Sequence, residues 1–182
     1  MDLFALFGIF LLVVTLGILT LVEARAERKK LLILDLNGVL VFRDKEKRID
    51  YVKRENVETF LDWCFENFDV ALWSSARKHN VERIAKEVMG AERIKRLRFM
   101  WHQDQCTPHP TVEYVFKKPL QKVWDIYGPQ YDQTNTLIMD DTAEKMEDNP
   151  PNTWFPVKTW KGDDDNEEET LKQLEERLWK LK

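Results

Sequence analysis

Polar side chains end three apolar runs in this sequence, and together they could bind a metal ion and a phosphate group. Asp35 follows the first run and Ser74 ends the second. Asp140 and Asp141 end the third, and Lys118 lies just ahead of the helix expected before it. Carboxylate oxygens are the ligands that Mg²⁺ prefers, a lysine ammonium offsets phosphate charge, and a serine hydroxyl donates a hydrogen bond. The residue types therefore predict metal-assisted phosphate chemistry.

The apolar runs alternate with segments that have helical periodicity. Strands are expected at residues 31–34, 69–74, 97–101, 136–140 and 153–157, and helices at 57–68, 81–90, 119–127 and 171–181. This alternation predicts an α/β fold with a parallel sheet and helices on both faces. The carboxyl ends of such strands meet at one edge, so the polar residues should converge there. The segment 102–117 has room for a small β insertion at most.

The first part of the sequence predicts a membrane anchor. Residues 3–22 carry no charge, and about twenty helical residues match the thickness of a bilayer core. The alternative is a cleaved signal peptide, but the apolar run is long and no Lys or Arg precedes it. We therefore expect an anchor at 1–22, a charged linker at 23–30 and a folded domain at 31–182. The short linker would hold this domain close to the lipid surface.

Charge indicates the orientation of the anchor and the class of partner. Arg25, Arg28, Lys29 and Lys30 follow the apolar run, so the positive-inside rule places the domain on the cytosol-like side of the membrane. The chain has a net charge of −4, which does not favour a nucleic-acid partner. A domain held at a membrane is restricted to partners at or in that membrane. Other membrane proteins in a complex are therefore the expected partners.

Four motifs resemble one branch of the haloacid dehalogenase (HAD) superfamily. They are LLILDLNGVLV at 31–41, ALWSSA at 71–76, FKKPL at 116–120 and LIMDDT at 137–142. The branch includes the RNA polymerase II carboxy-terminal-domain phosphatases and the inner-membrane receptor subunit of the mitochondrial presequence translocase. This resemblance covers nearly all of the chain after Lys30. It implies a capless HAD-like Rossmannoid domain, and it slightly favours the mitochondrial inner membrane over the endoplasmic reticulum or nuclear envelope.

The resemblance also implies a role for each residue of the site. Asp35 would be the nucleophile and a Mg²⁺ ligand, and Asp140 and Asp141 would complete the metal site. Ser74 would bind the phosphate. Lys118 would balance its charge, with the adjacent Lys117 as an alternative.

One position departs from the family pattern. The family has a second Asp, the general acid/base, two residues after the nucleophile, and this chain has Asn37. Its backbone carbonyl would still reach the metal, but its amide cannot exchange the proton that hydrolysis requires. General acid/base assistance is commonly worth about 10²–10⁴-fold in rate. We therefore expect a catalytically impaired domain that serves as a structural or interaction subunit, with Mg²⁺ absent if the site has degenerated.

Two enzymatic alternatives remain open. The first is an active Mg²⁺-dependent protein Ser/Thr phosphatase that forms an aspartyl-phosphate and acts on a phosphoprotein. The second is a small-molecule phosphatase, which the absence of a cap domain disfavours. A zinc site at His102, Asp104, Cys106 and His109 is also disfavoured, because this spacing matches no standard zinc motif.

Overall fold

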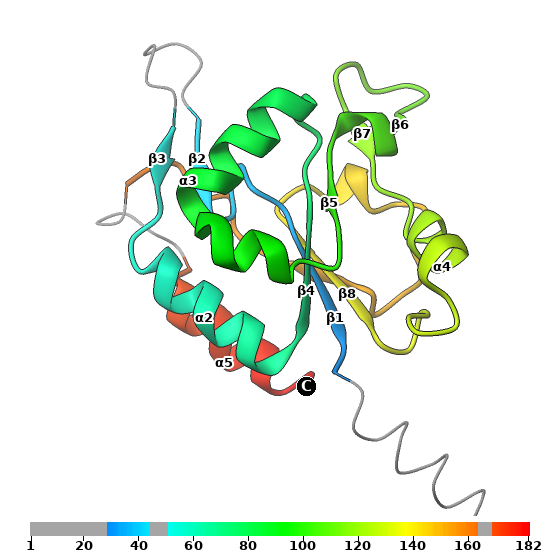
Figure 1. Cartoon of the computed structure of the whole chain (residues 1–182). Coiled ribbons are helices and arrows are strands. Elements are labelled where there is room, and N and C mark those ends of the chain that lie inside the picture. Colours follow the sequence, from blue (N-terminus) through cyan, green and yellow to red (C-terminus); the bar gives the residue numbers. More distant parts are fainter. Residues whose placement is uncertain (1–28, 44–50, 164–168) are drawn as a thin grey trace, which may run out of the picture.

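A five-stranded parallel sheet forms the centre of the computed structural model, which describes residues 29–43, 51–163 and 169–182 (Figure 1). The strand order is β5-β4-β1-β8-β9. The strands are β1 (Leu31–Leu34), β4 (Asp69–Trp73), β5 (Met100–Trp101), β8 (Thr136–Asp140) and β9 (Trp154–Pro156). The pairs are parallel throughout, which confirms the predicted sheet.

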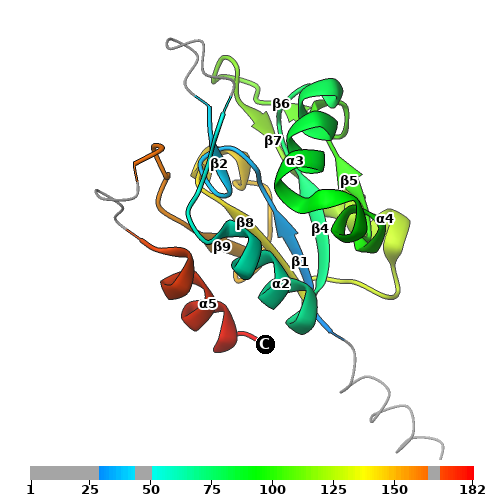
Figure 2. The same ribbon diagram turned by 60° about the vertical axis from the view of Figure 1, so that its left-hand side comes forward.

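Helices cover both faces of this sheet, as predicted (Figures 1 and 2). One face packs against α2 (Val57–Asn67), α3 (Lys78–Arg96) and α5 (Leu171–Trp179), and the other against α4 (Gln121–Tyr127). The central strand β1 is fully buried because helices pack on both of its faces. This burial explains why the strand is apolar at every position instead of alternating with polar residues.

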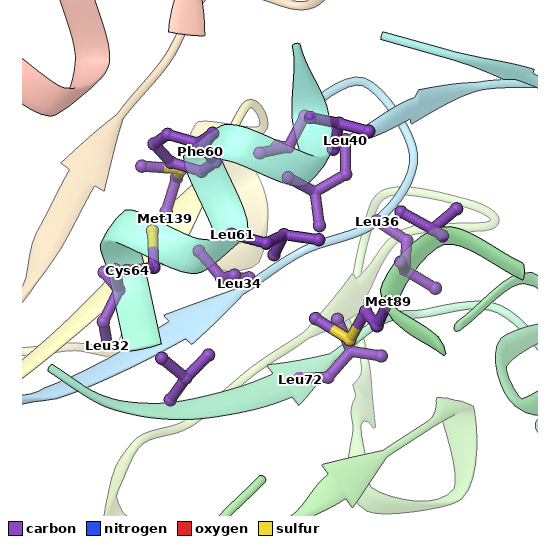
Figure 3. Close-up of a cluster of buried hydrophobic side chains, with 14 of the residues drawn as sticks. Leu32, Leu34, Leu36, Leu40, Phe60, Leu61, Cys64, Leu72, Met89 and Met139 are labelled. Atoms are coloured by element: carbon purple, nitrogen blue, oxygen red, sulfur yellow. The ribbon is translucent and has the colours of Figure 1, made fainter. Parts of the chain in front are cut away.

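Side chains of β1 divide between two apolar clusters. Leu32 and Leu34 point toward α2, where Phe60, Leu61 and Cys64 pack against them (Figure 3). The intervening residues Leu31 and Ile33 join the cluster on the α4 face. Cys64 is therefore buried in the core, against the central strand.

Several element boundaries differ from the sequence prediction. Helix α3 begins at Lys78, before the expected start, and it kinks at Gly90 before continuing to Arg96. Gly90 has a φ of 74°, a conformation that costs glycine little because it has no side chain. Strand β5 has only two residues, because the chain at Leu97 is still leaving α3.

Short antiparallel pairs flank the parallel sheet, and no second domain interrupts the described ranges. They are β2 (Val41–Phe42) with β3 (Val52–Lys53), and β6 (Thr107–Pro108) with β7 (Phe116–Lys117). The second pair is the small insertion expected at 102–117. Two 3-10 turns, η1 (Gln103–Gln105) and η2 (Ala143–Lys145), complete the elements.

The predicted anchor at residues 3–22 lies outside the described residues, as does most of the linker. Within the ranges that are described, no helix has the length and apolar character needed to cross a membrane. The division of the chain into an anchor at 1–22, a linker at 23–30 and a folded domain at 31–182 therefore stays a prediction.

Candidate active site

Strands β1 and β8 bring Asp35 and Asp140 together at the carboxyl edge of the sheet. The strands pair in register, with Leu34 opposite Met139, and the amide of Asp35 donates to the Met139 carbonyl at 3.0 Å. Both carboxylates are buried. The amide of Leu36 donates to Asp35 Oδ1 at 2.8 Å, which fixes this side chain at the end of its strand. The predicted convergence of the two carboxylates is confirmed.

Lys118 joins these carboxylates. Its Nζ lies 2.6 Å from Asp140 Oδ2 and 3.1 Å from Asp35 Oδ1, and the lysine side chain is fully buried. The side chain of Asn149 fixes the backbone around it, donating to the Lys118 carbonyl at 3.0 Å and accepting from the Leu120 amide at 2.8 Å. Lys118 therefore lies within the site, between the two carboxylates.

Its neighbour Lys117 is directed elsewhere. Lys117 lies on β7, and its Nζ pairs with Asp148 at 2.7 Å. Of the two lysines left open by the sequence, Lys118 is therefore the one in the site.

A second lysine, which the sequence analysis missed, also lies in the site. Lys145 Nζ is 3.1 Å from Asp35 Oδ2, 3.1 Å from Asp140 Oδ1 and 3.7 Å from Asp141 Oδ1. It ends the turn η2, which follows β8 directly. Its only sequence signal is its position four residues after Asp141, a spacing that brings side chains together on a helical turn.

The ion pairs set the protonation behaviour of the site. Burial alone would raise the pKa of Asp35, but Lys118 and Lys145 outweigh it and hold this pKa well below its ordinary value. For Asp140, burial and the neighbouring charge of Asp35 raise the pKa despite the same two lysines. The pKa of Lys145 is raised, because its three carboxylate partners outweigh the effect of burial. Asp35 is thus an ionised carboxylate with the charge that a nucleophile requires.

Gly38 and Thr142 position the third carboxylate, Asp141. The Thr142 hydroxyl donates to Asp141 Oδ1 at 2.9 Å. Gly38 has a φ of 82°, and a Cβ at this position would overlap Asp141 Oδ2. Glycine therefore allows the loop after β1 to pass directly against the carboxylate.

The donor atoms suit Mg²⁺, but a side-chain cation already lies among them. Oxygens of Asp35, Asp140 and Asp141 lie within 4.8 Å of one another, an arrangement that could hold a metal ion. Oxygen ligands are those that Mg²⁺ prefers. The ammonium of Lys145, however, contacts all three carboxylates. The cluster has the chemistry of a Mg²⁺ site, with the ammonium of Lys145 among its oxygens.

Asn37 and Ser74 lie at the same edge of the sheet, outside the ion pairs. Asn37 is exposed, and its side-chain carbonyl accepts from the Arg43 amide at 2.9 Å. Ser74 is buried at the end of β4, where its hydroxyl accepts from the Ala76 amide at 3.3 Å. The described residues therefore combine a candidate nucleophile and two ammonium groups with an amide at the acid/base position.

The disfavoured zinc residues have other partners. His102 accepts from the amide of Asp104, and the ring of His109 lies 3.1 Å from Glu147. Cys106 is buried, and its Sγ lies 3.7 Å from the His102 carbonyl oxygen. Among the described residues, the only group of three or more potential metal ligands is that of Asp35, Asp140 and Asp141.

Relatives with similar sequences cover most of the folded region. A Schizosaccharomyces pombe protein described as an uncharacterized FCP1 homology domain-containing protein is 32% identical over 145 residues, or 69% of this chain and 59% of that protein. The ubiquitin-like domain-containing CTD phosphatase 1 of Xenopus tropicalis is 30% identical over 131 residues, or 69% of this chain and 41% of that protein. The chain therefore matches only about half the length of these relatives.

Solved structures support the same fold. The RNA polymerase II CTD phosphatase Fcp1 has a TM-score of 0.55 at 14% identity, covering 80% of this chain and 46% of Fcp1. A fission yeast Fcp1 variant bound to beryllium fluoride has a TM-score of 0.56 at 14% identity, covering 89% of this chain and 53% of the Fcp1 chain. The sequence model of the NLI interacting factor-like phosphatases matches residues 30–182. This chain belongs to the NLI interacting factor-like phosphatase family, whose domain has the HAD-like fold.

Proposed function

We propose that this chain is a catalytically impaired member of the family, anchored in a membrane and used as an interaction subunit of a membrane protein complex. The observation that carries the proposal is Asn37. Hydrolysis of a phosphate ester by Asp35 would require a proton for the departing alcohol and removal of a proton from the attacking water. At neutral pH an amide can neither donate the first proton nor accept the second. General acid/base assistance, commonly worth about 10²–10⁴-fold in rate, is therefore lost.

The hydrogen bonds of Asn37 indicate that it holds the loop after β1 in place. Its carbonyl oxygen accepts the Arg43 amide, and its backbone bridges to Val41, so the residue joins the loop after β1 to β2. An aspartate could accept the same hydrogen bond. The substitution Asn37→Asp should therefore leave this loop in place while restoring an ionisable group.

A phosphatase assay tests whether the chain is catalytically impaired. The full chain, purified in mild detergent, would be compared with its Asp35→Asn and Asn37→Asp variants, using a phosphopeptide and p-nitrophenyl phosphate with Mg²⁺. We expect the native chain to release phosphate no faster than the Asp35→Asn control. Mg²⁺-dependent release that Asp35→Asn abolishes would instead establish the alternative, an active phosphoprotein phosphatase.

The placement of the termini supports the anchored arrangement. Lys30 lies at the amino end of β1 and its Nζ donates to the Leu181 carbonyl at 2.6 Å, so both ends of the domain meet at one edge of the sheet. Asp35 lies at the opposite end of the same strand. An anchor at residues 3–22 would therefore leave the carboxyl edge of the sheet, with the loops over the buried cluster, facing away from the lipid. The mitochondrial inner membrane remains the favoured location in this proposal.

Two measurements test the membrane assignment. Alkaline extraction should leave the native chain in the membrane pellet and release a variant that lacks residues 3–22. Isolation from native membranes in mild detergent should recover the chain with other membrane proteins in fixed proportion. Release of the native chain by alkali, or its recovery alone, would contradict the proposal.

A further inference from the structure

We propose that the ammonium of Lys145 takes the position of the divalent metal ion, so that the native carboxylate cluster is built to persist without Mg²⁺. This inference concerns what holds the cluster together, and it goes beyond the proposed loss of acid/base chemistry at Asn37. It would make the chain a metal-independent member of a phosphatase family.

The contacts of Lys145 are those that a metal ion in this cluster would make. Its Nζ contacts Asp35 and Asp140 at 3.1 Å each and Asp141 at 3.7 Å. These are the three carboxylates whose oxygens lie close enough to hold a metal ion. Magnesium binds oxygens at about 2.0–2.1 Å, so an ion bound by these oxygens on the side of Lys145 would overlap the ammonium. The lysine and the metal therefore exclude each other.

The backbone also holds Lys145 in this position. Lys145 ends the turn η2, and its carbonyl accepts the amide of Lys118 at 2.9 Å. Its amide in turn donates to the Thr142 carbonyl at 3.3 Å. Only 13% of its side chain is exposed, so leaving the cluster would require movement into solvent and the loss of three carboxylate contacts.

The charges of the cluster make Lys145 and Mg²⁺ alternatives to each other. Three carboxylates and the ammonium groups of Lys118 and Lys145 leave one net negative charge among largely buried groups. Adding Mg²⁺ beside Lys145 would leave a net positive charge instead. Replacing Lys145 by Mg²⁺ would give neutrality, so removing this lysine should create a metal site from the same carboxylates.

The test is a comparison of Mg²⁺ binding by the native chain and by Lys145→Met, with Lys122→Met as the matched control. Lys122 donates to the backbone carbonyls of Gln105 and Cys106, outside the cluster, so its loss removes a lysine without opening the metal position. Each full chain, stripped of metal and held in mild detergent, would be titrated with Mg²⁺ at constant ionic strength. Calorimetry and the melting temperature would report binding.

We expect Lys145→Met to bind Mg²⁺ at least tenfold more tightly than the native chain. Its melting temperature should rise by about 5 °C at roughly twenty times its dissociation constant. The native chain and Lys122→Met should shift by less than half as much in the same titration. Native binding as tight as that of Lys145→Met would overturn the proposal.

A second measurement uses only the native chain, in case Lys145→Met does not fold. Mn²⁺ is paramagnetic and broadens the NMR signals of nearby groups. The amide signals of Leu36 and Thr142 should stay sharp at Mn²⁺ concentrations that would saturate a free three-carboxylate site. Their selective broadening would overturn the proposal. Both measurements read metal binding and not turnover, so a negative result would leave the argument from Asn37 intact.

Discussion

Replacing Lys118 by methionine should destabilise the domain more than replacing any lysine that lies outside the carboxylate cluster. The substitution keeps most of the side-chain volume and removes the ammonium that joins Asp35 to Asp140. At an effective dielectric constant of about 20, the pairs at 2.6 Å and 3.1 Å carry gross attractions of about 6 and 5 kcal/mol. Much of this gross attraction is offset by the cost of burying the ammonium, and breaking a buried pair typically costs about 3–5 kcal/mol.

The pH dependence of the stability lost in Lys118→Met provides an internal check. At neutral pH, Lys118→Met leaves two buried carboxylates with only Lys145 between them. As the pH falls, a proton can bind to one of them and relieve the repulsion. The difference in the free energy of unfolding between native and variant should therefore be largest near pH 7 and smaller near pH 4.

Urea unfolding followed by tryptophan fluorescence would measure the effect in the full chain. Lys117→Met is the matched control, because Lys117 is the adjacent residue and its ammonium pairs with Asp148 outside the cluster. We expect Lys117→Met to lose clearly less free energy of unfolding than Lys118→Met. A loss below about 1 kcal/mol for Lys118→Met, or an equal loss for Lys117→Met, would refute the reasoning about the buried cluster.

Three further predictions concern the supports of the site. Gly90→Ala should cost about 1–3 kcal/mol, because the φ of 74° and ψ of 162° at this position suit only glycine. Gly38→Ala should cost more, because an added Cβ would also overlap Asp141; equal losses in thermal unfolding would contradict this. Asn149→Ala should cost about 1–3 kcal/mol in urea unfolding, because the buried backbone on either side of Pro119 loses two hydrogen bonds; an unchanged midpoint would contradict it. The pKa of Asp35 is lowered, so its ionised form stabilises the fold above about pH 4 and this contribution is lost as the pH falls further. Asp35→Asn should therefore show a shallower loss of stability in an acid titration, and an unchanged slope would contradict the assignment.

The residues at the strand ends were predictable because strand burial leaves a clear sequence pattern. A parallel strand buried on both faces must be apolar throughout, so a carboxylate directly after it marks the strand end. This pattern located Asp35 and Asp140 without any structure. The resemblance of the motifs to a known family then predicted the fold and the role of Lys118.

The rest of the site depends on contacts that have no periodic signal. Lys145 lies on a 3-10 turn, and apart from its position four residues after Asp141 nothing in its local sequence distinguishes it from a solvent-exposed lysine. The choice between Lys117 and Lys118 depends on the register of the two-residue strand β7. The early start of α3 could not be predicted, because the first turn contains only exposed or partly exposed polar residues.

In our proposal this chain keeps the carboxylate edge of a phosphatase, but Asn37 replaces the proton donor and Lys145 takes the metal position. The most direct measurement is Mg²⁺-dependent phosphate release by the native chain beside the double variant Asn37→Asp/Lys145→Met. We predict no Asp35-dependent release by the native chain and a rate at least about 100-fold higher for the double variant, the lower end of what acid/base assistance supplies. A native chain that releases phosphate as fast as the double variant would contradict the account.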